Sequence, residues 1–265
     1  FIDLFDGIND IKKSQLRLIH SNSVKDDPTR IFRGARYASR LDFKLSSNSI
    51  NQVKSTIDAW PWNWVPGDNP NTAPTAMASR LRMELDILFE KEPWEKAIKN
   101  LQEWGGLQLL DQDIQNDQQW NKRIRSGIKL GVEPLTALIS AAKDPLLLAI
   151  RLHLASKQQS LLSEAIELKE FMSSINLSKK NTTWHPSKWC SEIEIKSWNP
   201  ESVPIAICLG VPLWKPLFKW WRKWRLIKSN TTAKDLIAQG WKPGPAIGKE
   251  LQRLRKKELE RLEQT

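Results

Sequence analysis

Residues 26–41 read DDPTRIFRGARYASRL, and this stretch decides the fold because it contains a complete amphipathic helix. The pattern predicts Asp27 as the N-cap, Pro28 at the first helical position and an end near Leu41. At about 100° per residue, four arginines fall within an arc of about 120° on one face. They are Arg30, Arg33, Arg36 and Arg40. The opposite face is apolar, with Ile31, Phe32, Ala35 and Ala38.

Four arginines on one face are unusual, because an exposed helix more often interleaves glutamates that pair with basic residues at i,i+4. Such a face favours binding of an anionic ligand. The alternative is a solvated face whose arginines pair with acidic side chains elsewhere in the chain. The sequence leaves both readings open.

The segments on either side also have helical periodicity. Only 11 glycines occur in 265 residues, and alternating β-branched patterns are scarce. We therefore expect an all-α chain with at most one short strand, at 1–4, and an irregular polar segment at 178–198. Further helices are expected at 76–89, 93–104, 134–140, 145–171, 201–209, 216–228, 234–239 and 246–264.

The charge of the chain is concentrated at its C-terminal end. The formal net charge is +11, and residues 211–265 alone carry 14 basic and 5 acidic side chains. A basic end on a nearly neutral body is typical of a protein that binds a polyanion. The alternative is a well-solvated surface.

The composition also excludes several classes of protein. No apolar run approaches the roughly 18 residues of a membrane span, and residues 1–10 do not resemble a signal peptide. Two cysteines, Cys190 and Cys208, are too few for a disulfide scaffold, and packing is their expected role. The three histidines are too scattered to indicate a metal site. We expect a reduced, cytoplasmic setting and no membrane association.

Two segments of the basic end have the residue types of a nucleic-acid contact. The first is WKPLFKWWRKWR at 214–225, where an aromatic stripe, expected to be core, lies beside Lys215, Lys219 and Arg222. The second is GWKPGPAIG at 240–248, a Gly/Pro loop leading into the last predicted helix. Free N–H groups at a helix start favour phosphate. Its candidate RNA-binding residues are Lys242, Gly244, Gly248 and Lys249.

Three motifs resemble those of the class II tRNA nucleotidyltransferase and bacterial poly(A) polymerase family. Asp3, Gly7 and Asp10 are similar to the motif that ends the family's catalytic head. Asp26-Asp27-x-x-Arg30 resembles its Glu-Asp-x-x-Arg motif, with Asp26 in place of Glu. The loop at 240–248 resembles the C-terminal signature Gly-x-x-Pro-Gly-Pro-x-Ile-Gly.

This resemblance implies an elongated helical neck, body and tail. It places the end of the head at 1–22, the neck with a base-selecting helix at 23–67, the neck and body at 68–178, the body at 179–230 and a basic tRNA-binding tail at 231–265. It implies nucleotidyl transfer from CTP or ATP to tRNA with two magnesium ions. The metal-binding carboxylates belong to the head, so we expect no catalytic residue here and no activity of the chain alone.

The resemblance assigns base selection to Asp27 and Arg30, which suits the chemistry of these side chains. A carboxylate accepts from an exocyclic amine, and a guanidinium donates to a ring nitrogen. Cytosine and adenine both present this donor beside this acceptor, whereas uracil and guanine present an acceptor to the carboxylate. Arg33 and Arg36 are expected to contact the triphosphate or neighbouring nucleotide atoms, and Arg40 the RNA.

Two other functions remain open from the sequence. A bacterial poly(A) polymerase would share the neck, although the Gly-x-x-Pro-Gly-Pro loop favours the tRNA enzyme. A non-catalytic RNA-binding protein would keep the neck and tail without a head.

Overall fold

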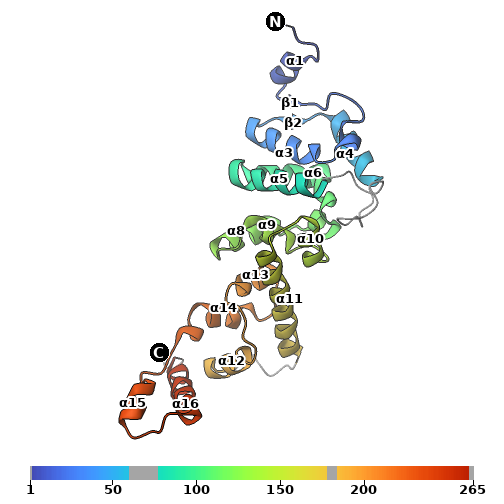
Figure 1. Ribbon diagram of the computed structural model, residues 1–265. Helices are drawn as coiled ribbons and strands as arrows, with labels where there is room; N and C mark the ends of the chain where they lie inside the picture. Colours follow the sequence, from blue (N-terminus) through green and yellow to red (C-terminus); the bar gives the residue numbers. More distant parts are fainter. Residues whose placement is uncertain (1, 60–76, 178–183, 263–265) are drawn as a thin grey trace. The chain divides into compact units, whose positions relative to one another are not determined.

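The computed structural model describes residues 2–59, 77–177 and 184–262, and these ranges are predominantly helical (Figure 1). The chain divides into two compact units, Phe1–Ser160 (unit 1) and Leu161–Thr265 (unit 2). This confirms the expected all-α fold. The five-part division stays a prediction, and its boundaries near 67 and 178 lie outside the described residues.

Unit 1 is built from short helices and one pair of two-residue strands. β1 (Gln15–Leu16) pairs in parallel with β2 (Lys44–Leu45), with Gln15 opposite Lys44. The helices are α1 (Gly7–Lys12), α2 (Ser23–Asp26), α3 (Arg30–Leu41), α4 (Ser47–Asp58), α5 (Met77–Lys91), α6 (Trp94–Trp104), the 3₁₀ turn η1 (Gly106–Leu109), α7 (Gln112–Asn116), α8 (Trp120–Lys129), α9 (Pro134–Ile139) and α10 (Pro145–Arg151).

Within the described residues of unit 2, all the regular secondary structure is helical. α11 (Ser156–Leu177) contains the boundary between the two units. The helices that follow are α12 (Pro186–Ile193), α13 (Ser202–Cys208), α14 (Trp214–Arg222), the 3₁₀ turn η2 (Trp224–Leu226), α15 (Ala233–Ala238) and α16 (Pro245–Arg261).

The apolar face of α3 lies in the core of unit 1. Phe32 and Ala35 are fully buried, and α3 packs against α5 and α6 (Figure 1). A Cβ added to Gly106 would lie 2.7 Å from Cγ2 of Ile31, so η1 approaches α3 too closely for any larger residue. This packing fixes α3 and turns its arginines toward α5 and the surface.

Several predicted boundaries differ from the structure. Residues 2–4 form no strand, and β1 and β2 lie elsewhere. The helix expected at 145–171 is broken, because His153 has a φ of 53°, a left-handed conformation that ends α10. The segment expected to be irregular contains α12, which begins at Pro186. Cys190 and Cys208 are buried, as expected for packing residues, and burial raises the pKa of the Cys190 thiol to about 12.

Candidate nucleotide and nucleic-acid interface

Asp27 lies between α2 and α3, with both oxygens of its carboxylate engaged. Oδ1 accepts from the backbone N of Thr29 at 3.1 Å and from its hydroxyl at 2.6 Å. Oδ2 lies 3.3 Å from Nη1 of Arg80 in α5. The prediction that Asp27 caps a helix starting at Pro28 is therefore wrong by two residues. Pro28 and Thr29 form a turn, and α3 starts at Arg30.

Arg30 is half-buried at the first position of α3. Its Nη1 donates to the carbonyl of Ser23 in α2 at 3.0 Å. Within the described ranges, no ion pair joins Arg30 to Asp27. The guanidinium and the carboxylate are thus each fixed by other groups and do not pair with each other, so a donor and an acceptor both lie at the start of α3.

Arg33 lies one turn further along α3 and is exposed. Its Nε is 3.6 Å from a carboxylate oxygen of Glu84 in α5. A hydrogen bond with Tyr37 raises the pKa of the Arg33 guanidinium, and the charges of Glu84 and Asp27 add to this effect. Arg33 is therefore a cation held beside the Asp27–Arg30 pair.

Arg36 is not an exposed part of the arginine face. It is buried, its Nη1 donates to Glu84, and its Nε is 3.3 Å from Oε1 of Glu92. Glu92 also accepts two hydrogen bonds from Arg40, from Nε at 3.0 Å and from Nη2. The hydrogen bond from Arg40 holds the pKa of Glu92 below its ordinary value.

The arginine face thus agrees in part with both interpretations of the sequence, because its arginines pair with acidic side chains and some of them also stay exposed. Three arginines meet two buried glutamates, so the cluster keeps a net positive charge, and Arg33 and Arg40 remain half-exposed. Sequence reasoning missed Arg80, Glu84 and Glu92, because each lies about fifty residues from its partner and no local spacing connects them. Whether the arginines bind nucleotide or RNA stays a prediction.

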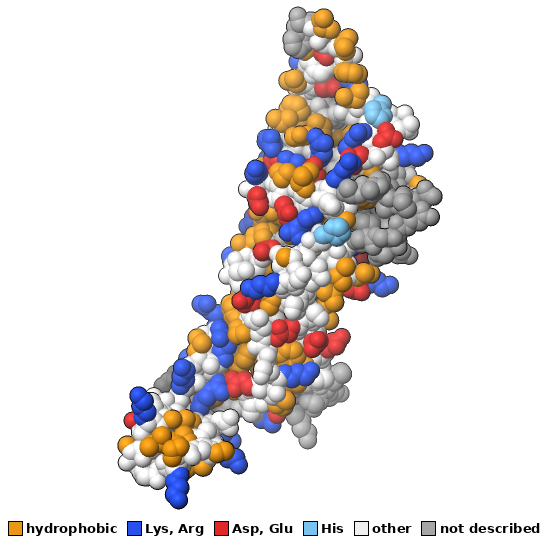
Figure 2. Space-filling view, in the orientation of Figure 1, with side chains coloured by type: hydrophobic (Ala, Val, Ile, Leu, Met, Phe, Trp, Pro, Cys, Tyr) orange, Lys and Arg blue, Asp and Glu red, His pale blue; other side chains and the backbone are white. Residues whose placement is uncertain are grey.

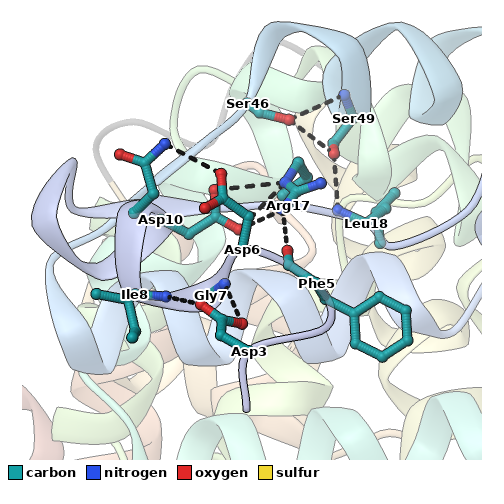
Figure 3. Close-up of polar contacts among 11 residues, drawn as sticks. Asp3, Phe5, Asp6, Gly7, Ile8, Asp10, Arg17, Leu18, Ser46 and Ser49 are labelled. Carbon is teal, nitrogen blue, oxygen red and sulfur yellow. Dashed lines mark hydrogen bonds and ion pairs between the residues drawn. The ribbon is translucent and has the colours of Figure 1, made fainter. Parts of the chain in front are cut away.

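The carboxylates of the N-terminal segment are also engaged (Figure 3). Asp3 accepts from the backbone N–H groups of Gly7 and Ile8, both at 2.8 Å, and these bonds hold the pKa of Asp3 below its ordinary value. Asp10 pairs with Arg17 at 3.0 Å. In the described part of the chain, no group of three or more His, Cys, Asp or Glu side chains is arranged to hold a metal ion.

An apolar surface lies beside these carboxylates. We call it the N-terminal apolar surface, and it consists of the exposed side chains Ile2, Leu4, Phe5, Ile8, Ile11, Ile19 and Leu41. A cavity of about 330 Å³ opens among Phe5, Ile11, Ile19, Leu41 and Phe43. Large contiguous apolar patches on a soluble surface mark interaction sites.

In unit 2, α14 places its cations on the surface. Lys215, Lys219 and Arg222 are exposed, as expected. The prediction that the aromatic stripe starting at Trp214 forms the core is wrong for that residue, which is half-exposed. Leu217 and Trp220 are buried instead, because the helix faces the interior one position away from the predicted stripe.

The Gly/Pro loop leads into α16, which begins at Pro245. The four candidate residues of this segment, Lys242, Gly244, Gly248 and Lys249, are exposed. α16 is tied to the rest of unit 2 by Arg255, whose two Nη atoms lie 2.6 and 2.8 Å from the carboxylate of Glu194, the residue that follows α12. The loop is therefore presented to solvent from an anchored helix.

Comparisons with known proteins agree with the motifs. A CC-adding tRNA nucleotidyltransferase of Deinococcus radiodurans is 25% identical over 264 residues, which cover 96% of this chain and 53% of that protein. An A-adding tRNA nucleotidyltransferase of Geobacter sulfurreducens is 32% identical over 114 residues, which cover 43% of this chain and 12% of that protein. Over nearly its whole length the chain is thus similar to a tRNA nucleotidyltransferase.

Solved structures of tRNA nucleotidyltransferases share the fold. The Thermotoga maritima CCA-adding enzyme complexed with tRNA gives a TM-score of 0.61 at 20% identity. The matched region covers 98% of this chain and 63% of the Thermotoga chain. A CCA-adding enzyme with CTP gives a TM-score of 0.58 at 20% identity. The matched region covers 98% of this chain and 62% of the chain of that enzyme. No family model matches the chain.

The chain spans about half the length of the Deinococcus tRNA nucleotidyltransferase and under two thirds of the Thermotoga enzyme. Within the described ranges, none of its helices combines the length and the apolar character that a membrane span requires.

Proposed function

We propose that this chain is the tRNA-binding and nucleotide-selecting part of a tRNA nucleotidyltransferase that adds C, A or both to tRNA 3′ ends during cytoplasmic tRNA processing. The observation that carries the proposal is the placement of Asp27 and Arg30 at the start of α3 without an ion pair between them. Each is held by its own third partner, and together they offer an acceptor and a donor at the start of α3.

Asp27 and Arg30 select the base of ATP or CTP in this proposal. The Asp27 carboxylate accepts from the exocyclic amine, and the Arg30 guanidinium donates to the neighbouring ring nitrogen. Uracil and guanine would bring a second acceptor to the carboxylate. A mispaired polar group costs about 1–3 kcal/mol, which corresponds to roughly tenfold to a hundredfold discrimination.

The other arginines of α3 divide into two roles. Arg33 and Arg40 are exposed enough to meet triphosphate or RNA oxygens. The predicted nucleotide contact of Arg36 becomes a positioning role here. Because its guanidinium is buried between Glu84 and Glu92, it fixes α3 against α5 rather than reaching a ligand.

Unit 2 binds tRNA through phosphates in this proposal. Lys215, Lys219 and Arg222 on α14 are exposed, as are Lys242 and Lys249 around the start of α16. Exposed cations at a helix start suit backbone phosphates rather than base edges.

The resemblance assigns two magnesium ions to this reaction, and the described residues do not fit them. The carboxylate of Asp3 is bound by backbone N–H groups and that of Asp10 by Arg17. We therefore place the metal ligands in a separate catalytic domain. The N-terminal apolar surface supports this arrangement, because its side chains would leave solvent if such a domain packed against them.

The test is RNA binding by the full chain. Filter binding is measured with tRNA lacking its 3′ CCA and with a double-stranded RNA of equal nucleotide length, at physiological salt. The proposal predicts tighter binding to tRNA. Equal affinity for both RNAs would show a general polyanion binder and contradict the proposal.

A further inference from the structure

Unit 2 carries an exposed aromatic and apolar patch that the proposed function leaves without a role. Ile237 is 45% exposed and Trp241 is 38% exposed. Lys234, Lys242 and Lys249 are exposed in the same segment. We call these five residues the Trp241 surface. Figure 2 shows hydrophobic side chains gathered over the region of α15 with Lys and Arg side chains around them.

The backbone holds Trp241 in place at the end of α15. Gly240 has a φ of 94°, and its N–H donates to the carbonyl of Ile237 at 2.9 Å. The N–H of Trp241 donates to the carbonyl of Leu236 at 3.0 Å. These two bonds form a Schellman motif, which fixes the position of the residue after the glycine. Trp241 is therefore presented to solvent from an ordered turn.

The acidic neighbours of the Trp241 surface are already engaged. Asp235 accepts from the backbone N and the hydroxyl of Thr232, both at 2.8 Å. Glu250 pairs with Arg253 at 2.6 Å. Among the described residues, no acidic side chain pairs with the three lysines of the surface. Their charge is available to an anionic partner.

We propose that the Trp241 surface binds an unpaired nucleotide of the tRNA, with the indole stacked on the base and the lysines at the flanking phosphates. This inference rests on the proposed function and names the part of the RNA that unit 2 meets. An aromatic face surrounded by cations suits an exposed base, because every base has a π face and its neighbours carry phosphates. A duplex keeps its bases stacked inside and offers only its backbone.

The experiment compares Trp241→Ala and Trp241→Phe with the wild-type chain by filter binding to tRNA and to double-stranded RNA of equal length. Ile195→Ala is the matched control, because Ile195 is an exposed apolar residue of unit 2 outside the surface. Loss of an aromatic stacking partner weakens binding by about 5- to 150-fold. Trp241→Ala should therefore weaken tRNA binding at least about fivefold, with Trp241→Phe close to wild type and duplex binding unchanged.

Any other result overturns the inference. The results also distinguish a failure of the inference from a failure of the proposed function. If wild type does not prefer tRNA to the duplex, both fail. If it does and Trp241→Ala binds tRNA as wild type does, the Trp241 surface has no such role and the proposed function stands. Sedimentation with vesicles of phosphatidylglycerol and phosphatidylcholine tests a lipid partner. Vesicle binding that Trp241→Ala abolishes, with tRNA binding unchanged, would replace the inference.

Discussion

Arg36 of α3 and Glu84 of α5 form a buried ion pair, with 9% and 5% of their side chains exposed. Arg33 lies on the other oxygen of Glu84, and Arg36 also reaches Glu92. The helix that begins at Arg30 and directly follows Asp27 is therefore fixed to α5 by charge as well as by its apolar face.

Removing Glu84 should destabilise unit 1. Removing Glu84 leaves the buried Arg36 guanidinium with Glu92 alone, a carboxylate that it shares with Arg40. Breaking a buried pair costs about 3–5 kcal/mol. We expect Glu84→Ala to lower the free energy of unfolding by roughly that amount, measured by urea denaturation. The control is Glu103→Ala, which removes an exposed i,i+4 pair with Lys99 and should cost less than about 1 kcal/mol. Equal losses in the two variants would mean that the buried pair does not hold α3.

The contribution of Glu92 to the stability of the folded state should depend on pH. The hydrogen bond from Arg40 lowers the pKa of Glu92 in the folded state below its ordinary value of 4.5. Folding therefore favours the carboxylate, and the resulting stability is complete above about pH 4.5 and is lost as the pH falls through the lower, folded-state pKa. The stability difference between wild type and Glu92→Gln should be constant near neutral pH and shrink below about pH 4.5. A stability difference that widens as the pH falls would contradict a lowered pKa of Glu92 in the folded state.

The choice of base should depend on Asp27 and Arg30. In a protein that joins this chain to a catalytic nucleotidyltransferase domain, Asp27→Ala and Arg30→Ala should reduce the preference for CTP and ATP by about tenfold to a hundredfold. The measurement is kcat/KM for CTP, ATP, UTP and GTP, with tRNA affinity as the control. If all four values fall by the same factor, the two residues have a structural role only.

The lysines of unit 2 should set the salt dependence of tRNA binding. Neutralising Lys215, Lys219, Lys242 and Lys249 together should weaken binding similarly across tRNA sequences. It should also flatten the log–log salt dependence by up to about 0.7–0.9 for each phosphate that is no longer neutralised. The matched control neutralises four exposed lysines of unit 1, Lys54, Lys91, Lys122 and Lys129. An unchanged slope in the first variant would identify its lysines as ordinary solvated charges.

Periodicity predicted α3 well and its surroundings poorly. The buried Phe32 and Ala35 follow from helical spacing. The start was misplaced because the carboxylate of Asp27 holds Thr29 in a turn, a local alternative that competes with helix capping. The partners of Arg36 depend on how α5 packs against α3, and spacing within one helix carries no such information.

In unit 2, periodicity likewise failed to predict which face of α14 is buried. The residues at 214, 218 and 221 form an apolar stripe, yet α14 buries Leu217 and Trp220. In a helix with so many tryptophans, two faces are nearly equally apolar, and only the packing of neighbouring helices decides between them. The exposed lysines of α14 and of the Gly/Pro loop were predicted correctly, because the cost of burying an unpaired charge keeps them at the surface.

We infer that this chain selects nucleotides and holds tRNA for a catalytic domain that supplies the metal site. The most direct test incubates tRNA lacking its 3′ CCA with labelled CTP and ATP and magnesium. One reaction contains this chain alone, and the other contains the chain joined to a catalytic nucleotidyltransferase domain. We predict no incorporation above background by the chain alone and extension of the tRNA by the joined protein. Incorporation by the chain alone, or no extension by the joined protein, would contradict the account.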